Sequence, residues 1–208
     1  MRPFHSLSAI AAPLPRDNVD TDAIFPGRFI QRMDIDFGRS LFAAWRFDAD
    51  EAEQPDFVLN RPPFRQAEIL VAGWNFGCGS SREHAVWALA AWGIRCVIAK
   101  SFGDIFFGNC VNNGLLAVAL PEPAVEDLMR WLATAAEPRL QVDLPAQTVG
   151  GPAGPICFDI TPERKHRLLQ GLDEIDLTLE RAGDIARFSA THGRNRPWVF
   201  EGLSGSKD

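Results

Sequence analysis

The segment GWNFGCGSSREH, residues 73–84, carries the residue types best suited to chemistry. Its glycines tolerate backbone conformations that other residues resist, so another group can approach the chain closely. If a helix begins after the serines, its N-terminus stabilises an anion, and the guanidinium of Arg82 matches a carboxylate with two donors. The same N–H groups could hold Ser80 partly as an alkoxide, which acts as a base. The segment is therefore predicted to be an anion site that contains a reactive hydroxyl.

A purely structural explanation of the same residues stays open. Residues 80–83 (SSRE) have the form of a capping box, with Ser80 as the N-cap and Glu83 at the third helical position. Two nucleotide-binding loops are excluded. No Gly-Lys-Ser/Thr follows, as a P-loop requires, and Arg82 stands where a dinucleotide-binding loop needs its third glycine.

Two other segments carry polar residues in close spacing. Asn18–Pro26 (NVDTDAIFP) places aspartates on both sides of Thr21 in a predicted loop, and a turn closed by an aspartate side chain is the simpler explanation. Lys100–Leu116 (KSFGDIFFGNCVNNGLL) is predicted to be structural, because its phenylalanines suit packing and its asparagines suit turns or caps.

The elements that must position these residues form an alternating α/β pattern from Glu68 onward. Residues 1–65 are punctuated by prolines and are predicted to be loop-rich, with a long loop region near 28–60. A single domain is expected over 1–192, followed by a flexible tail at 193–208. The predicted strands are 68–73, 95–99, 115–120, 140–144 and 156–160, and the predicted helices are 83–92, 101–112, one from Pro121, 162–170 and 179–188.

Composition limits the classes of function. A net charge of −6 over 208 residues lacks the basic face that nucleic-acid binding needs. No apolar run is long enough to cross a membrane and no secretory signal is recognisable, so a cytoplasmic protein is predicted. The four cysteines form no CxxC pair, so this chain alone is not expected to hold a metal or a cluster.

Taken together, the three segments resemble the swivelling domain of the aconitase superfamily. NVDTDAI, NFGCGSSREHA and the run from IAKSFGDIF to NGLL have the order and spacing of stand-alone small subunits of the isopropylmalate isomerase family. The resemblance extends to FAAWRF, DFVLN and the late GLDEIDLTL. It implies an α/β fold, specifically a three-layer β/β/α swivelling domain.

The resemblance also implies an activity and its residues. The family consists of hydro-lyases that interconvert 2-isopropylmalate and 3-isopropylmalate by dehydration and rehydration in leucine biosynthesis. By position in the motifs, Ser80 corresponds to the catalytic base and Asp22 to an active-site aspartate, while Arg82 and Ser81 correspond to substrate-binding residues. The [4Fe–4S] cluster and its three cysteine ligands belong to the large subunit, so this chain is expected to bind no cofactor and to act with that partner on a small malate-like acid.

One departure from the family pattern leaves the substrate open. Where small subunits of the leucine pathway read Arg-Thr-Gly-Phe, this chain has the acidic run Asp34-Ile35-Asp36-Phe37-Gly38. One alternative is therefore a paralogous hydro-lyase subunit that acts on methylmalate, dimethylmalate or homoaconitate. Another is a non-catalytic anion-binding or assembly module that keeps the loop for its capping box.

Overall fold

The computed structural model describes residues 1–31, 34–80, 82–196 and 198. It divides into two compact units, Met1–Gly171 and Leu172–Asp208. Within the described residues, no helix is both long enough and apolar enough to pass through a lipid bilayer.

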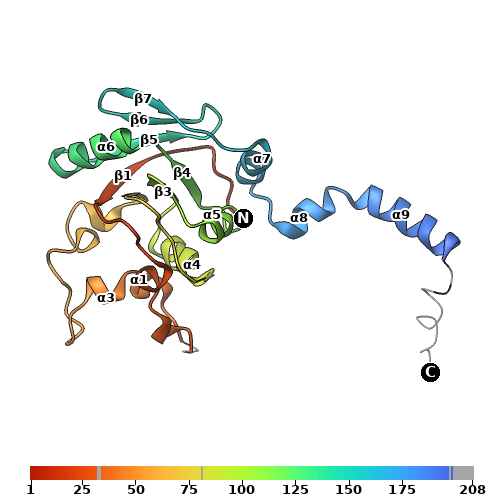
Figure 1. Cartoon of the computed structure of the whole chain (residues 1–208), viewed down its shortest axis with the longest axis horizontal. Helices are drawn as coiled ribbons and strands as arrows, with labels where there is room; N and C mark the ends of the chain where they lie inside the picture. The colour runs from red at the N-terminus through yellow and green to blue at the C-terminus, as the bar shows by residue number, and fades with distance from the viewer. Residues whose placement is uncertain (32–33, 81, 197, 199–208) are drawn as a thin grey trace. The chain divides into compact units, whose positions relative to one another are not determined.

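In the described part of the first unit, seven strands form one sheet in the order β4-β3-β2-β1-β5-β6-β7 (Figure 1). Strand β1 joins a parallel half to an antiparallel half. Its residues 11–14 pair in parallel with β2, whereas residues 6–10 pair antiparallel with β5. The strands are β1 (Ser6–Leu14), β2 (Ile69–Ala72), β3 (Cys96–Ala99), β4 (Leu116–Ala119), β5 (Arg139–Asp143), β6 (Thr148–Gly151) and β7 (Gly154–Cys157).

The short parallel strands are buried on both faces, which explains their uninterrupted apolar sequences. In β2, Leu70 and Ala72 face one core together with α4 and α5, and Ile69 and Val71 face a second core together with α6. This sheet of parallel and antiparallel strands, with helices on both sides, agrees with the predicted α/β fold class. The helices of this unit are α1 (Thr21–Ile24), α2 (Phe37–Ser40), α3 (Ala43–Arg46), α4 (His84–Trp92), α5 (Asp104–Asn112), α6 (Glu122–Thr134) and α7 (Pro162–Gln170), with 3₁₀ turns η1 (Gly27–Phe29), η2 (Val58–Asn60) and η3 (Phe64–Gln66).

Most elements predicted from residue 68 onward are confirmed within a few residues, but four points need correction. The loop-rich interpretation of the N-terminus missed β1, and β6 was not predicted at all. The strand predicted at 156–160 ends at Cys157. The helix predicted at 179–188 is interrupted near Glu180, so that two helices stand there instead, α8 (Glu174–Leu179) and α9 (Ala182–Asn195).

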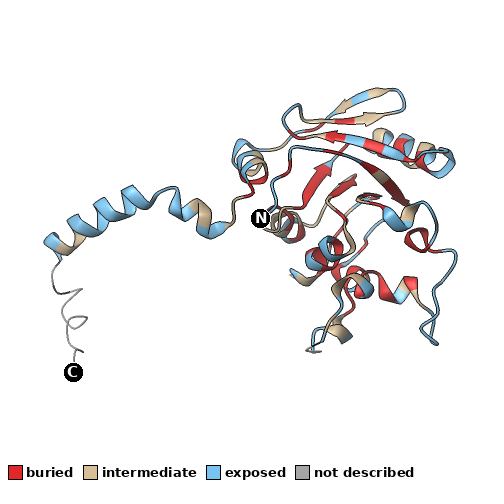
Figure 2. Ribbon diagram, turned by 180° about the vertical axis from the view of Figure 1, so that it is seen from behind, coloured by how far each residue is buried: buried red, intermediate tan, exposed pale blue. Residues whose placement is uncertain are grey.

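The second unit contains α8 and α9. The Asp173 side chain caps α8 by accepting hydrogen bonds from the amides of Ile175 and Asp176, both at 2.8 Å. Neither helix buries a residue, and Figure 2 shows α9 almost wholly exposed. The expected domain boundary at 192 stays a prediction, and residues 199–208 lie outside the described part of the chain.

Much of the region between residues 38 and 60 is organised around a buried cation. The Arg46 side chain, whose residue is 4% exposed, donates from Nη1 to the carbonyls of Gly38 and Leu41 at 3.1 and 3.3 Å. Its Nε donates to Asn60 Oδ1 at 3.1 Å, and its guanidinium lies 4.1 Å from the Trp92 ring centre. Burial lowers the pKa of Arg46 to about 10, so the group remains charged at neutral pH.

Candidate functional site

Backbone hydrogen bonds bring the three sequence segments side by side. The amide of Gly77 donates to the carbonyl of Val19 at 2.7 Å, and that of Thr21 donates to the carbonyl of Cys78 at 2.9 Å. On the other side of the loop, Phe76 donates to Ser101 at 3.0 Å and accepts from Gly103 at 2.9 Å. The loop of residues 74–80 is thus held between the 18–22 segment and the start of the third segment.

Glycine is required where these segments meet. Gly77 has a φ of +75°, and an added Cβ would lie 2.1 Å from Phe106 Cγ. A Cβ on Gly103 would lie 2.7 Å from the carbonyl oxygen of Gly77. Because an added Cβ would clash at both positions, Gly77 and Gly103 allow the first and third segments to pack closely.

The central feature of the site is an ion pair between Asp22 and Arg82, two residues that are 60 positions apart in the sequence. Asp22 Oδ1 also accepts from the Gly27 amide at 3.1 Å, and a Cβ on Gly27 would approach that oxygen to 3.2 Å. The hydrogen bond from Arg82 lowers the pKa of Asp22 below its ordinary value, and the Gly27 amide lowers it further. Asp22 is therefore ionised at neutral pH and holds the guanidinium in a fixed direction.

Ser80 lies at the same place but does not cap the helix. Its residue is exposed, and its carbonyl accepts from the Thr21 hydroxyl at 3.0 Å. Among the described residues, no hydrogen bond involves the Ser80 hydroxyl. Thr21, which is buried, therefore fixes the backbone at Ser80 and leaves the hydroxyl available.

The capping-box interpretation is wrong. Helix α4 begins at His84, and Glu83 occupies the cap position without a side-chain capping bond. The Glu83 carboxylate instead accepts from Asn113 Nδ2 at 2.7 Å, and Asn113 Oδ1 accepts from the Trp87 indole at 3.0 Å. A tertiary partner has taken the carboxylate that the box would use. Because α4 begins only at His84, no bond from a helix N–H group to the Ser80 hydroxyl occurs among the described residues.

Of the four predicted site residues, the structure brings Asp22, Ser80 and the Arg82 side chain to one place, while Ser81 lies outside the described residues. Sequence reasoning missed Thr21 and Gly27. A buried threonine between two aspartates was a possible signal for Thr21. Nothing in the sequence indicated Gly27, because its role depends on a contact made across the fold.

The cysteines of this chain do not fit a cluster. Cys96 and Cys110 are fully buried in the cores, and burial raises the pKa of both thiols, which keeps them protonated. Cys157 is exposed on β7, whereas Cys78 belongs to the loop beside Asp20. In the described residues, no three histidines, cysteines or carboxylates converge as metal ligands would.

Comparison with known proteins identifies the family. Residues 1–123 match the aconitase C-terminal domain, and residues 174–202 match the C-terminal domain of the 3-isopropylmalate dehydratase small subunit. The chain is 52% identical to the 3-isopropylmalate dehydratase small subunit of Jannaschia sp., over 96% of this chain and 100% of that protein. It is 50% identical to the corresponding subunit of Dinoroseobacter shibae over the same shares of both chains. The chain belongs to the 3-isopropylmalate dehydratase small subunit family.

A solved structure supports the same assignment for the fold. The 3-isopropylmalate dehydratase of Methanocaldococcus jannaschii superposes with a TM-score of 0.62 at 26% identity, covering 88% of this chain and 98% of that one. The family membership and this likeness confirm the predicted swivelling-domain fold of the aconitase superfamily. Helices α8 and α9 of the second unit lie within residues 174–202, the range that matches the C-terminal domain of the 3-isopropylmalate dehydratase small subunit.

Proposed function

We propose that this chain is the small subunit of a two-subunit hydro-lyase that interconverts 2-isopropylmalate and 3-isopropylmalate in leucine biosynthesis. Relatives named as 3-isopropylmalate dehydratase small subunits, which the chain matches over their whole length, support the proposal. We propose further that a [4Fe–4S] cluster resides wholly on the large subunit, since the cysteines of this chain are dispersed and two of them are buried.

The observation that carries the proposal is the Asp22–Arg82 pair beside Ser80. The side chain of Arg82 is 23% exposed, and within the described residues Asp22 binds only its Nη1 atom. Its remaining donors are available for a substrate carboxylate, to which a guanidinium binds through paired hydrogen bonds. Asp22 orients this clamp.

In this proposal Ser80 is the base. The proton to be removed lies on the carbon next to a carboxylate and is weakly acidic, so the hydroxyl must be held close to that carbon. Thr21 fixes the backbone of Ser80, and Arg82 both aligns the acid and provides the nearby positive charge that favours an alkoxide. The large subunit would cover this exposed site and exclude water from it.

A second substrate class is favoured by a neighbouring cavity. A cavity of about 300 Å³ lies beyond η1, and its wall includes Arg28, Phe29, Asp34, Asp36 and Arg39. The wall carries carboxylates and guanidinium groups together, and this polar lining suits a malate whose substituent is smaller or more polar than an isopropyl group. A paralogous reaction on methylmalate, dimethylmalate or homoaconitate would use the same Ser80 and Arg82.

Co-purification with the large subunit tests the proposed function. The assembled enzyme, prepared without oxygen, is expected to interconvert the two isopropylmalates, and the isolated chain is expected to be colourless and inactive. Faster turnover of a methylated malate or of homoaconitate would transfer the assignment to the second substrate class. A chain that pairs with no large subunit would instead support the non-catalytic binding or assembly role.

A further inference from the structure

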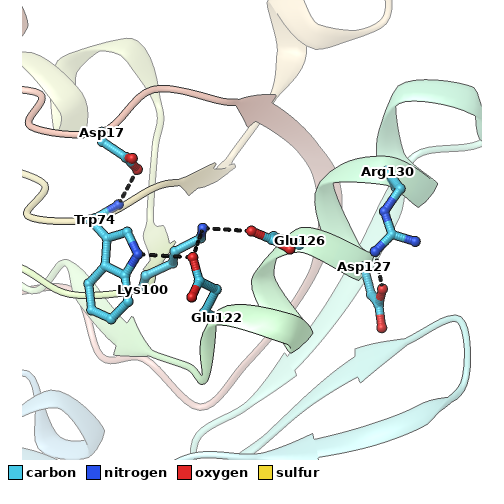
Figure 3. A network of polar contacts seen from close by, with 7 residues as sticks. All are labelled: Asp17, Trp74, Lys100, Glu122, Glu126, Asp127 and Arg130. Atoms are coloured by element: carbon cyan, nitrogen blue, oxygen red, sulfur yellow. Dashed lines mark hydrogen bonds and ion pairs between the residues drawn. The ribbon is translucent and has the colours of Figure 1, made fainter.

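A nearly buried ammonium group lies at the end of β3, outside the Asp22–Arg82 pair. The side chain of Lys100 is 10% exposed, and its Nζ donates to Glu122 Oε1 at 2.6 Å and to Glu126 Oε1 at 2.9 Å (Figure 3). Both glutamates belong to the first turns of α6 and raise the pKa of Lys100. The end of β3 is thereby tied to this helix. Figure 3 also draws the pair Asp127–Arg130, which lies on α6 and does not contact Lys100.

The two glutamates differ in one respect. The indole Nε1 of Trp74 donates to the same Glu122 oxygen at 3.1 Å, whereas no indole bond to Glu126 occurs in the described residues. Glu122 therefore connects Lys100 to the first residue of the 74–80 loop. The Lys100 ammonium lies 6.0 Å from the centre of the indole ring, at the outer limit of a cation–π contact.

Trp74 is held through its main chain as well. Its amide donates to Asp17 Oδ1 at 2.7 Å, and Gly73, the residue before it, leaves room for this approach. Asp17 directly precedes the segment that carries Asp22. Trp74 therefore joins the 74–80 loop to the segment that begins at residue 18, at the point where these two segments start to lie side by side.

We propose that Trp74, Glu122 and Lys100 are positioning residues, which set the 74–80 loop and hence Ser80 against the Asp22–Arg82 pair. Only the expected effect of these residues on catalysis rests on the proposed function. None of these side chains contacts the reacting groups, so they act through the loop. A displacement of about 1 Å at a reacting group can lower a rate by about a hundredfold, so a weak anchor has a measurable effect.

Glu122→Ala and Glu126→Ala form a matched pair of variants for the assembled two-subunit enzyme. Each removes one carboxylate from Lys100, at similar exposures of 47% and 50%, but only Glu122→Ala frees the indole. Glu122→Ala and Trp74→Phe are expected to lower kcat about tenfold while KM changes less than about threefold, because the carboxylate clamp is intact. Glu126→Ala should stay within about twofold of the parent, and the double variant Trp74→Phe/Glu122→Ala should equal the single ones. Equal kcat values for Glu122→Ala and Glu126→Ala would overturn the proposal.

Hydrogen exchange of the full chain tests the positioning role independently of catalytic activity. In Glu122→Ala and Trp74→Phe, the amides of Phe76, Gly77 and Thr21 should exchange faster than in the parent, since their bonds join the loop to its two neighbours. In Glu126→Ala they should exchange at the parental rate. If the parent complex proved inactive on every malate-type acid, the proposed function would fail, and this exchange difference would still support the anchor. Identical exchange in both alanine variants would refute it.

Discussion

Replacement of Ser80 by alanine separates the catalytic role from every structural one. The serine is exposed, α4 begins only at His84, and in the described residues the hydroxyl makes no hydrogen bond. An N-cap serine replaced by alanine costs about 1 kcal/mol of stability. A surface substitution away from such features stays within about 0.5 kcal/mol, and Ser80→Ala should belong to this second class.

The effect on turnover should be much larger. A general base contributes about a hundredfold to ten-thousandfold, so the barrier should rise by about 3–5 kcal/mol. KM should change little, because the carboxylate clamp of Arg82 and Asp22 is untouched. Ser80→Asp is expected to keep the fold and to lose the activity as well.

The assay combines urea unfolding of the isolated chain with kcat and KM of the assembled enzyme, its iron content being measured in each preparation. Ser8→Ala, at an exposed serine of β1, is the matched control and should be parental in both respects. Near-parental turnover in Ser80→Ala or Ser80→Asp would refute the assignment of the base. A stability loss of about 1 kcal/mol or more would restore a capping role.

Gly77→Ala should destabilise the chain by about 3 kcal/mol in urea unfolding, because its Cβ would meet Phe106 at 2.1 Å, whereas Gly79→Ala, with its nearest contact at 3.5 Å, should cost only about 1 kcal/mol. Asp22→Asn should remove a stabilisation of at most about 1 kcal/mol near pH 6. Because Arg82 lowers the pKa of Asp22, the stability advantage of the parent over Asp22→Asn is complete at pH values above the ordinary pKa of about 4. This advantage is lost as the pH falls through the lowered pKa, and thermal unfolding as a function of pH would measure the loss. Arg82→Lys keeps the charge but loses the paired donors, so kcat/KM should fall about tenfold to a hundredfold. The iron content of the assembled enzyme should stay unchanged when alanine singly replaces Cys78, Cys96, Cys110 or Cys157.

Each of these outcomes has a clear opposite. Equal losses for Gly77→Ala and Gly79→Ala would mean that backbone conformation, and not the contact with Phe106, requires the glycine. A parental advantage over Asp22→Asn that did not shrink as the pH was lowered below the ordinary pKa of aspartate would exclude the ion pair as its source. Full activity of Arg82→Lys would reduce Arg82 to a surface charge, and iron loss in any cysteine variant would place a ligand on this chain.

The sequence by itself determined the parallel core and the family. The apolar runs of β2, β3 and β4 are readable because strands buried on both faces carry no polar residue, and this is a local property. The three polar segments could also be recognised locally, because the residues of each segment are contiguous in the sequence. Ser80 and Arg82 could therefore be proposed as site residues from their own segment, whereas Asp22 was proposed from the resemblance of its segment to the family.

Only the tertiary structure decided how those segments meet. Strand β1 was missed because its burial alternates where it pairs with β5 and becomes continuous where it pairs with β2, so neither pattern spans a full window. Glu83 satisfies a local capping rule, yet Asn113, 30 residues away, binds its carboxylate instead. Contacts such as Asp22–Arg82 and Trp74–Glu122 join residues whose separation is set by sheet pairing, and no periodicity within either segment encodes the partner.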